Sequence, residues 1–179
     1  MRQTKIVIVG AGLVGASAAL FVALAIPSAQ VVIIDVARVR AEGQVLDLAH
    51  AAAFWGHSRF RAGDYEDARD ADIVVITAGA GVRPGETRLH LAKTNADIAA
   101  VIVDRIAPLA PEAIYLIATN PCDVLTGAVY GRLNCARERV ISTGTSLDTG
   151  RLRSLLSERL GVVASAIHAY VLGEHANRP

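Results

Sequence analysis

The apolar residues of this chain fall into short β-branched runs separated by alanine- and leucine-rich segments. Runs at 5–9, 31–35 and 71–77 are bounded by charge or glycine, which is typical of strands buried in a parallel sheet. The same pattern predicts shorter strands at 58–62, 113–120 and 139–142, and a strand-like end at 166–172. Helical composition predicts helices at 13–25, 41–53, 89–106, 124–133 and 148–160. Since strands and helices alternate, right-handed crossovers give an α/β fold, a doubly wound parallel sheet with helices on both faces.

The N-terminal stretch permits a different interpretation. No charged side chain lies between Ile6 and Ile34, and Arg2 and Lys5 precede this run. Hydropathy alone would make it a signal peptide or a membrane helix, and residues 27–29 (Pro-Ser-Ala) resemble a cleavage site. An exported or membrane-anchored protein is therefore one hypothesis.

Three glycines argue against that hypothesis. Gly10, Gly12 and Gly15 have the spacing G-x-G-x-x-G between a β-branched run and a helix-like stretch, and Asp35 follows 20 residues after Gly15 at the end of a second run. This is the dinucleotide-binding fingerprint: one glycine forms the tight turn, one lets the backbone approach a pyrophosphate, and one allows close helix-strand packing. The acid accepts hydrogen bonds from ribose hydroxyls and repels a 2′-phosphate. The sequence therefore predicts NAD rather than NADP.

Composition narrows the partners. The 179 residues are 53% hydrophobic, which excludes disorder and favours one compact domain. Eighteen Lys plus Arg against 17 Asp plus Glu leave a net charge of +1, so we expect a small-molecule partner and neither nucleic acid nor membrane. Cys122 and Cys135 form no C-x-x-C pair and have no histidine at zinc spacing. We expect no metal, no disulfide and a cytoplasmic location.

Several polar residues follow predicted strands or begin predicted helices. They are Arg88 beyond a glycine-rich loop at 79–85, Asn120, Asp148, Arg151 and His175. Individually each has an ordinary structural explanation as a surface group, a turn former or a helix cap. Together they supply a cation for a carboxylate, a proton donor for a carbonyl oxygen and an acid to orient that donor. That set suits hydride transfer to a 2-oxo acid.

Motifs in order along the chain resemble those of the L-lactate/malate dehydrogenase family, most closely its bacterial L-lactate branch. They are G-A-G-L-V-G at 10–15, I-T-A-G at 76–79 with P-G-E-T-R at 84–88, A-T-N-P at 118–121, G-T-S-L-D-T at 144–149 and H-A-Y-V-L-G-E-H at 168–175. The resemblance implies a Rossmann NAD-binding domain at 1–144 and the beginning of a substrate domain at 145–179. It also implies NAD-dependent interconversion of pyruvate and L-lactate.

The resemblance assigns roles to the polar residues. His175 would be the acid/base, and Asp148 would orient it and stabilise its protonated form. Arg151 would bind the substrate carboxylate in a two-pronged pair, and Arg88 would polarise the carbonyl and help to exclude water. Asn120 would lie between nicotinamide and substrate.

The resemblance also implies binding positions outside the catalytic set. Cofactor contacts are expected, besides the glycines and Asn120, at Val14, Asp35, Arg40, Tyr65, Gly79, Ala80, Ala118 and Thr143. Arg153 and His168 fall where bacterial lactate dehydrogenases bind fructose 1,6-bisphosphate across a subunit interface. The full-length assembly is expected to be a homotetramer.

Two departures keep alternatives open. Val82 stands at the loop position that contacts the substrate side chain in the family, where lactate enzymes usually carry Gln and malate enzymes Arg, so a malate or other 2-hydroxy-acid dehydrogenase is an alternative. Four residues follow His175, and Ala176 and Asn177 replace the expected Gly-Asp, whereas the family continues with a second domain. We therefore expect a truncated or frameshifted reading frame. The remaining alternative is a non-catalytic NAD-binding fragment.

Overall fold

The molecule is built on a parallel sheet of six strands. The computed structural model describes residues 2–54, 56–81, 88–173 and 175. The strand order is β3-β2-β1-β4-β5-β6, and every pairing is parallel. The strands are β1 (Lys5–Val9), β2 (Gln30–Ile34), β3 (Arg59–Ala62), β4 (Ile73–Ile76), β5 (Ile114–Ile117) and β6 (Val140–Ser142).

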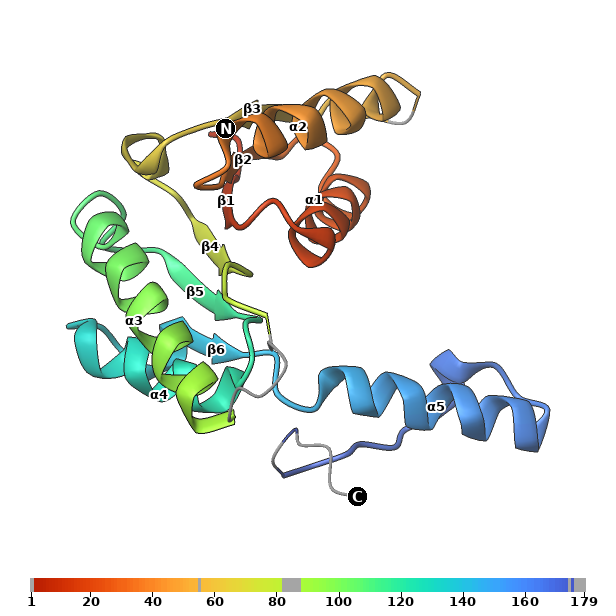
Figure 1. The fold of residues 1–179 in the computed structure, drawn as a ribbon. Coiled ribbons are helices and arrows are strands. Elements are labelled where there is room, and N and C mark those ends of the chain that lie inside the picture. The colour runs from red at the N-terminus through yellow and green to blue at the C-terminus, as the bar shows by residue number, and fades with distance from the viewer. Residues whose placement is uncertain (1, 55, 82–87, 174, 176–179) are drawn as a thin grey trace.

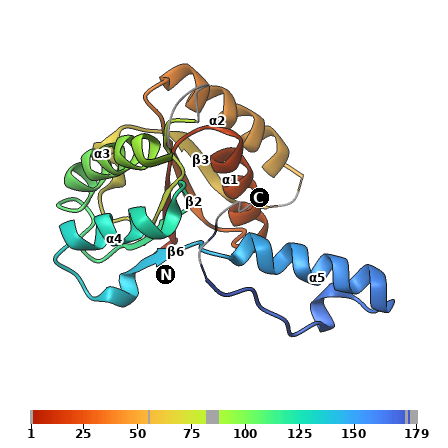
Figure 2. The same ribbon diagram turned by 60° about the horizontal axis from the view of Figure 1, so that its bottom comes forward.

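Helices cover both faces of this sheet (Figure 2). They are α1 (Leu13–Ala25), α2 (Arg38–Ala52), α3 (Arg88–Ile106), α4 (Cys122–Arg132) and α5 (Ser146–Leu160), with 3₁₀ turns η1 (Tyr65–Ala68), η2 (Arg137–Arg139) and η3 (Ala164–Ala166). Successive side chains of a strand point to opposite faces. Accordingly Ile6 and Ile8 pack in the core beneath α1 and α2, whereas Val7 and Val9 pack in the core beneath α3 and α4.

The strand order places β1 between β2 and β4 (Figure 1). From β1 the sheet continues to β2 and β3 on one side and to β4, β5 and β6 on the other, so the strand order reverses between β1 and β4. In open α/β sheets, ligands bind at this switch point, outside the carboxyl ends of the strands. The glycine turn after β1 lies there.

The structure confirms the predicted doubly wound sheet, its six strands and its five helices, with boundaries shifted by a few residues. The charge-free N-terminal stretch forms β1, α1 and β2, and Val31, Val32 and Ile33 are fully buried. Across the residues described, no helix combines the length and apolarity needed to span a membrane.

One element prediction is wrong. Residues 166–172 are not a strand: η3 ends at Ala166, and the chain then runs back along α5 without strand pairing (Figure 1). Its backbone hydrogen bonds go to side chains of α5 and its N-cap instead, at Val171 and Ala169. Apolar composition favoured a strand, but no sheet edge lies beside this segment to pair with it.

Helix α5 lies apart from the sheet (Figures 1 and 2). None of its residues is buried, and the leucines at 147, 155 and 160 are all more than half exposed. It packs mainly on η3 and on the segment that runs back along it.

Candidate functional site

The turn from β1 into α1 is possible only because two of its residues are glycines. Gly10 has a φ of 114°, in the region that favours glycine. A Cβ on Gly15 would lie 1.8 Å from the Gly10 carbonyl oxygen, so α1 can approach β1 only without a side chain there. The Thr77 hydroxyl donates to the carbonyls of Val9 and Gly10, each at 3.1 Å, and ties this turn to β4. The structure thus assigns the tight turn to Gly10 and the close helix-strand packing to Gly15.

Asp35 closes the other side of the turn. One carboxylate oxygen accepts the Ala11 N–H at 2.7 Å, and the other accepts the Ala37 N–H at 2.7 Å. Each carboxylate oxygen has a further lone pair for a ribose hydroxyl. The same negative charge would repel a 2′-phosphate, as the sequence predicts.

This corner fits a dinucleotide. A Cβ on Gly12 would meet nothing within 4 Å, so a ligand has room to approach the backbone. Gly12 is the N-cap of α1, where no side chain caps the helix and no acid stands in the first turn. Leu13 and Val14 are 90% and 61% exposed. The amides of this first turn and the positive end of the helix dipole are therefore open to a pyrophosphate.

A second polar group lies at the carboxyl ends of β4 and β5, and the sequence analysis missed the residue that organises it. Asn95 of α3 is 2% exposed. Its side-chain oxygen accepts the Ala80 N–H at 2.7 Å, and its amide donates to the Asn120 carbonyl at 2.8 Å. Asn95 thus joins the chain after β4 to the chain after β5.

One feature of the sequence could have revealed Asn95. It is a polar residue on the apolar face of a predicted helix, between Leu91 and Ala99 at helical spacing. A Cβ on Gly79 would lie 3.1 Å from its side-chain oxygen and 2.4 Å from the Thr119 methyl, which explains the glycine there. Thr119 adds a bond from its hydroxyl to the Ala78 carbonyl at 2.8 Å.

His175, Asp148 and Arg151 come together at the first turn of α5. The Nδ1 of His175 lies 2.6 Å from Oδ2 of Asp148, and the Arg151 Nη1 lies 3.3 Å from Oδ1. His175 and Asp148 side chains are 23% and 26% exposed, and Arg151 is 61% exposed. The hydrogen bond from His175, and then its charge and that of Arg151, hold the pKa of the Asp148 carboxyl below its ordinary value.

Because a carboxylate only accepts hydrogen bonds, Nδ1 of His175 carries a proton toward Asp148. The Nε2 atom is then the one left to exchange a proton with a ligand. The contact is the one expected between an imidazole and an orienting acid, and the acid/base role of His175 stays a prediction.

Other predicted residues take less distinctive positions. Ala118 and Thr143 follow β5 and β6, with amides bonded to Ile76 and Ile117 carbonyls at 3.0 Å. Arg40 is exposed on α2. Tyr65 packs against the core, with the Arg105 guanidinium 4.6 Å from its ring centre, and burial raises the pKa of its hydroxyl.

The predicted substrate residues lie on different segments. Arg88 is the first residue of α3, and Val82 lies outside the described residues. Asn120 is exposed, three residues after the end of β5.

Arg153 lies on α5 and contacts the chain segment that follows this helix, on which His168 lies. The Arg153 Nε donates to the Ala169 carbonyl at 3.0 Å, and its guanidinium lies 4.7 Å from the Tyr170 ring centre. His168, next to Ala169, is exposed.

The structure therefore forms three polar groups: the glycine turn with Asp35, the Asn95 cluster, and the His175 group on α5. Thr77 links the first to β4, whose end leads into the second. Among the described residues, no hydrogen bond or ion pair links the His175 group to the other two.

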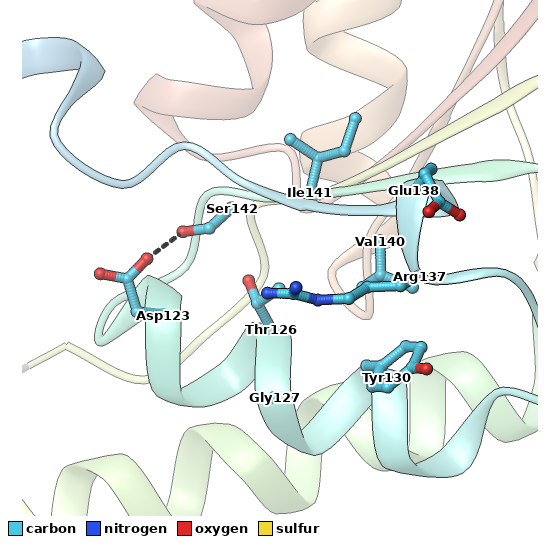
Figure 3. A pocket seen from close by; sticks show the side chains of 9 residues that line it. All are labelled: Asp123, Thr126, Gly127, Tyr130, Arg137, Glu138, Val140, Ile141 and Ser142. Carbon is cyan, nitrogen blue, oxygen red and sulfur yellow. Dashed lines mark hydrogen bonds between the residues drawn. The ribbon is translucent and has the colours of Figure 1, made fainter.

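A cavity of about 600 Å³ lies beside the edge strand β6 (Figure 3). Four residues of α4 and five from the η2–β6 segment line it: Asp123, Thr126, Gly127, Tyr130, Arg137, Glu138, Val140, Ile141 and Ser142. Arg137 extends along it toward Thr126, and the Ser142 hydroxyl donates to Asp123 at 2.5 Å. None of its lining residues belongs to the three groups above. No cluster of metal-ligating side chains occurs in the described part of the chain.

The sheet order, glycine turn and paired acid define a Rossmann-type dinucleotide-binding domain. Residues 4–142 match the family model described as lactate/malate dehydrogenase, NAD binding domain. The chain belongs to the lactate/malate dehydrogenase family and carries its NAD-binding domain.

Relatives agree with this assignment. The chain is 42% identical over 176 residues to L-lactate dehydrogenase 1 of Clostridium acetobutylicum and 44% identical over 177 residues to L-lactate dehydrogenase of Bacillus pumilus. It superposes with a TM-score of 0.92, at 42% identity, on a lactate dehydrogenase enzyme from a Medee basin deep-sea metagenome library. In each case 98% of this chain is covered but only 56% of the relative, so the chain spans about half the length of the relatives it matches.

Proposed function

We propose that this chain is the NAD-binding and acid/base part of an L-lactate dehydrogenase, which interconverts pyruvate and L-lactate. The observation that carries the proposal is the 2.6 Å contact between His175 and Asp148, in a chain whose sheet carries the NAD-binding fingerprint. Similarity to L-lactate dehydrogenases along 98% of the chain supports the lactate assignment.

The residues divide the chemistry between them. Bound NAD supplies the hydride donor or acceptor. His175 gives a proton from Nε2 to the carbonyl oxygen of pyruvate and takes it back in lactate oxidation, while Asp148 holds the ring and stabilises the imidazolium. Arg151 uses the guanidinium nitrogens not facing Asp148 for the substrate carboxylate. Arg88 polarises the carbonyl, and Asn120 lies between substrate and nicotinamide.

Turnover with three oxo acids tests the substrate assignment. We expect NADH oxidation to be fastest with pyruvate, slower with 2-oxoisocaproate and slowest with oxaloacetate. A preference for oxaloacetate would make the protein a malate dehydrogenase. NADH binding without turnover would favour a non-catalytic fragment.

The catalytic histidine has its own test. We expect His175→Asn to abolish turnover and to leave the NADH fluorescence enhancement nearly unchanged, because His175 contacts Asp148 and not the glycine turn. Equal loss of turnover and of NADH binding would mean that His175 is only structural.

We propose further that residues 1–144 are the NAD-binding domain and that 145–179 begin a substrate domain. In support, α5 buries none of its residues, and the relatives are nearly twice as long. Attaching the second half of the Bacillus pumilus relative after residue 175 should raise pyruvate-dependent turnover. An active 179-residue chain that gains nothing would contradict this division.

The proposed assembly is a cytoplasmic homotetramer regulated by fructose 1,6-bisphosphate. Arg153 of α5, which bonds the Ala169 carbonyl, and the neighbouring His168 offer a guanidinium and an imidazole, which suit a bisphosphate. In the full-length assembly, we expect Arg153→Gln to remove activation by the bisphosphate. Sedimentation measures the number of subunits in the assembly. Cell fractionation tests the cytoplasmic location.

A further inference from the structure

The path of the chain into His175 is set by a strap, defined here as residues 167–172. The strap runs back along α5 toward the sheet without strand pairing (Figure 1). Ile167 is its buried residue, while His168, Tyr170 and Leu172 are exposed. Burial alone therefore does not fix its position, and specific bonds must do so.

Three side chains spaced four residues apart, along one face of α5 from its N-cap, hold the strap. The Thr145 hydroxyl donates to the Val171 carbonyl at 2.5 Å, and the Val171 N–H donates to the Thr149 hydroxyl at 3.0 Å. One turn further on, Arg153 bonds the Ala169 carbonyl at 3.0 Å. Both polar backbone groups of Val171 are thus bound by hydroxyls from a single helical turn.

That turn also contains Asp148. The helical turn that carries Asp148 therefore also binds Val171, which lies four residues before His175. Thr145 is the N-cap of α5, a position where threonine ordinarily bonds an amide of its own helix, but it makes no such bond here. Its hydroxyl is bonded to the strap instead.

We propose that Thr149, together with Thr145, is a positioning residue that clamps Val171 and so holds the imidazole of His175 against Asp148. This role rests on the proposed function of His175 as the acid/base. In this role Thr149 acts through the strap and does not itself contact substrate or cofactor. Loss of the Thr149 hydroxyl leaves Val171 held by Thr145 alone, and loss of both hydroxyls leaves the strap attached at Ala169, two residues further from His175. In either case the ring samples more orientations.

The test uses the 179-residue chain and NMR of two signals: the carboxyl carbon of Asp148 titrated with pH, and the Nδ1 proton of His175. In Thr149→Val we expect the population in which His175 contacts Asp148 to become about tenfold less favoured, because the variant loses one hydrogen bond to the strap. The Nδ1 proton signal should be lost, and the pKa of the Asp148 carboxyl should rise toward its ordinary value. Thr149→Ser keeps a hydroxyl and should restore both signals.

Ser157→Ala is the matched control. Ser157 lies on the same helix, and its hydroxyl also bonds a backbone carbonyl, that of Val162, at 2.6 Å, but it does not touch the strap. We expect Ser157→Ala to lower Tm about as much as Thr149→Val and to leave both NMR signals unchanged.

The proposal is overturned if Thr149→Val keeps both signals, or if Ser157→Ala loses them to the same extent. It is also overturned if Thr149→Ser fails to restore them. The NMR signals need no turnover, so a chain that does not reduce pyruvate would count against the proposed function while leaving this result decisive for the clamp.

Discussion

Buried polar side chains carry much of the local order at the carboxyl ends of the strands. Asn95 satisfies a donor on Ala80 and an acceptor on Asn120, which lie on separate chain segments. Tyr115 of β5 is the opposite case. It is 2% exposed, and its hydroxyl has no hydrogen-bond partner among the described residues. Burial raises the pKa of this hydroxyl to about 12.

Replacing Asn95 tests its bridging role. We expect Asn95→Ala to lower the free energy of unfolding by about 1–2 kcal/mol, because it removes the hydrogen-bond partner of two part-buried backbone groups, the Ala80 N–H and the Asn120 carbonyl. Asp97→Ala on the same helix removes only an exposed pair with Lys93 and should change stability by less than about 0.5 kcal/mol. Denaturant titration measures both. Equal effects would mean that the Asn95 bonds carry no particular weight.

Phenylalanine should be more stabilising than tyrosine at position 115. We expect Tyr115→Phe to raise the free energy of unfolding by about 1 kcal/mol, because it removes a buried hydroxyl that has lost water without gaining a partner. Tyr130→Phe, at a residue 41% exposed, is the control and should have little effect. A destabilised Tyr115→Phe in the same denaturation series would show that the hydroxyl is satisfied in solution.

The acid of the His175 group has a defined dependence on pH. Its folded pKa lies below the unfolded value of 3.8, so its contacts stabilise the fold above about pH 4, and this contribution is lost as pH falls through the lower folded pKa. Carboxyl NMR should show the pKa of Asp148 rising more in His175→Ala than in Arg151→Ala. The reverse order would mean that the arginine, not the hydrogen bond from His175, dominates.

At the scale of elements, the turn between β1 and α1 contains one glycine that packing requires and another that leaves room for a ligand. A side chain at Gly15 would collide with the Gly10 carbonyl, whereas one at Gly12 would project into open space. The two glycines stand three residues apart in one motif, yet only one of them is required by the fold.

This difference predicts opposite outcomes for two alanine variants. We expect Gly15→Ala to lower the free energy of unfolding by about 2–3 kcal/mol, because α1 must move away from β1. Gly12→Ala should leave Tm nearly unchanged but weaken NADH binding about tenfold, since its methyl occupies the approach of the pyrophosphate. Thermal unfolding and NADH fluorescence titration separate the two. A Gly12→Ala chain that binds NADH normally would remove Gly12 from the site.

For the whole molecule, stability is concentrated in the sheet. Val7, Val31, Val32 and Val74 are completely buried, whereas α5 contains no buried residue. The His175 group therefore lies on the less stabilised part of the structure.

Hydrogen exchange should reveal this gradient. We expect amides of β1 and β4 to be protected at least roughly 100-fold more than those of α5, because opening α5 exposes little apolar surface. Sheet and helix amides exchanging alike would show that α5 is covered in solution, and dilution would then test whether a second copy of the chain covers it.

Local patterns were sufficient for the sheet and the glycine turn. Ile6 to Val9 and Val31 to Ile34 are β-branched because they are buried on both faces, and Gly10, Gly15 and Asp35 act through neighbours that the motif itself specifies. The Asp148 and His175 pair was predicted from a family resemblance, and the contact at 2.6 Å agrees with it. Asn95 was missed, since its partners are 15 and 25 residues away in sequence.

The sequence by itself thus determined the succession of strands and helices along the chain and the glycine turn with Asp35. The reason is that the periodicity of buried residues and the conformation of glycine are local properties. Only the tertiary structure decided where residues 167–172 go. Their apolar composition is that of a strand, yet a strand needs a neighbouring edge, and α5 offers hydroxyls and a guanidinium instead. Those bonds depend on which helix face meets the returning chain, a property that no pattern within either segment contains.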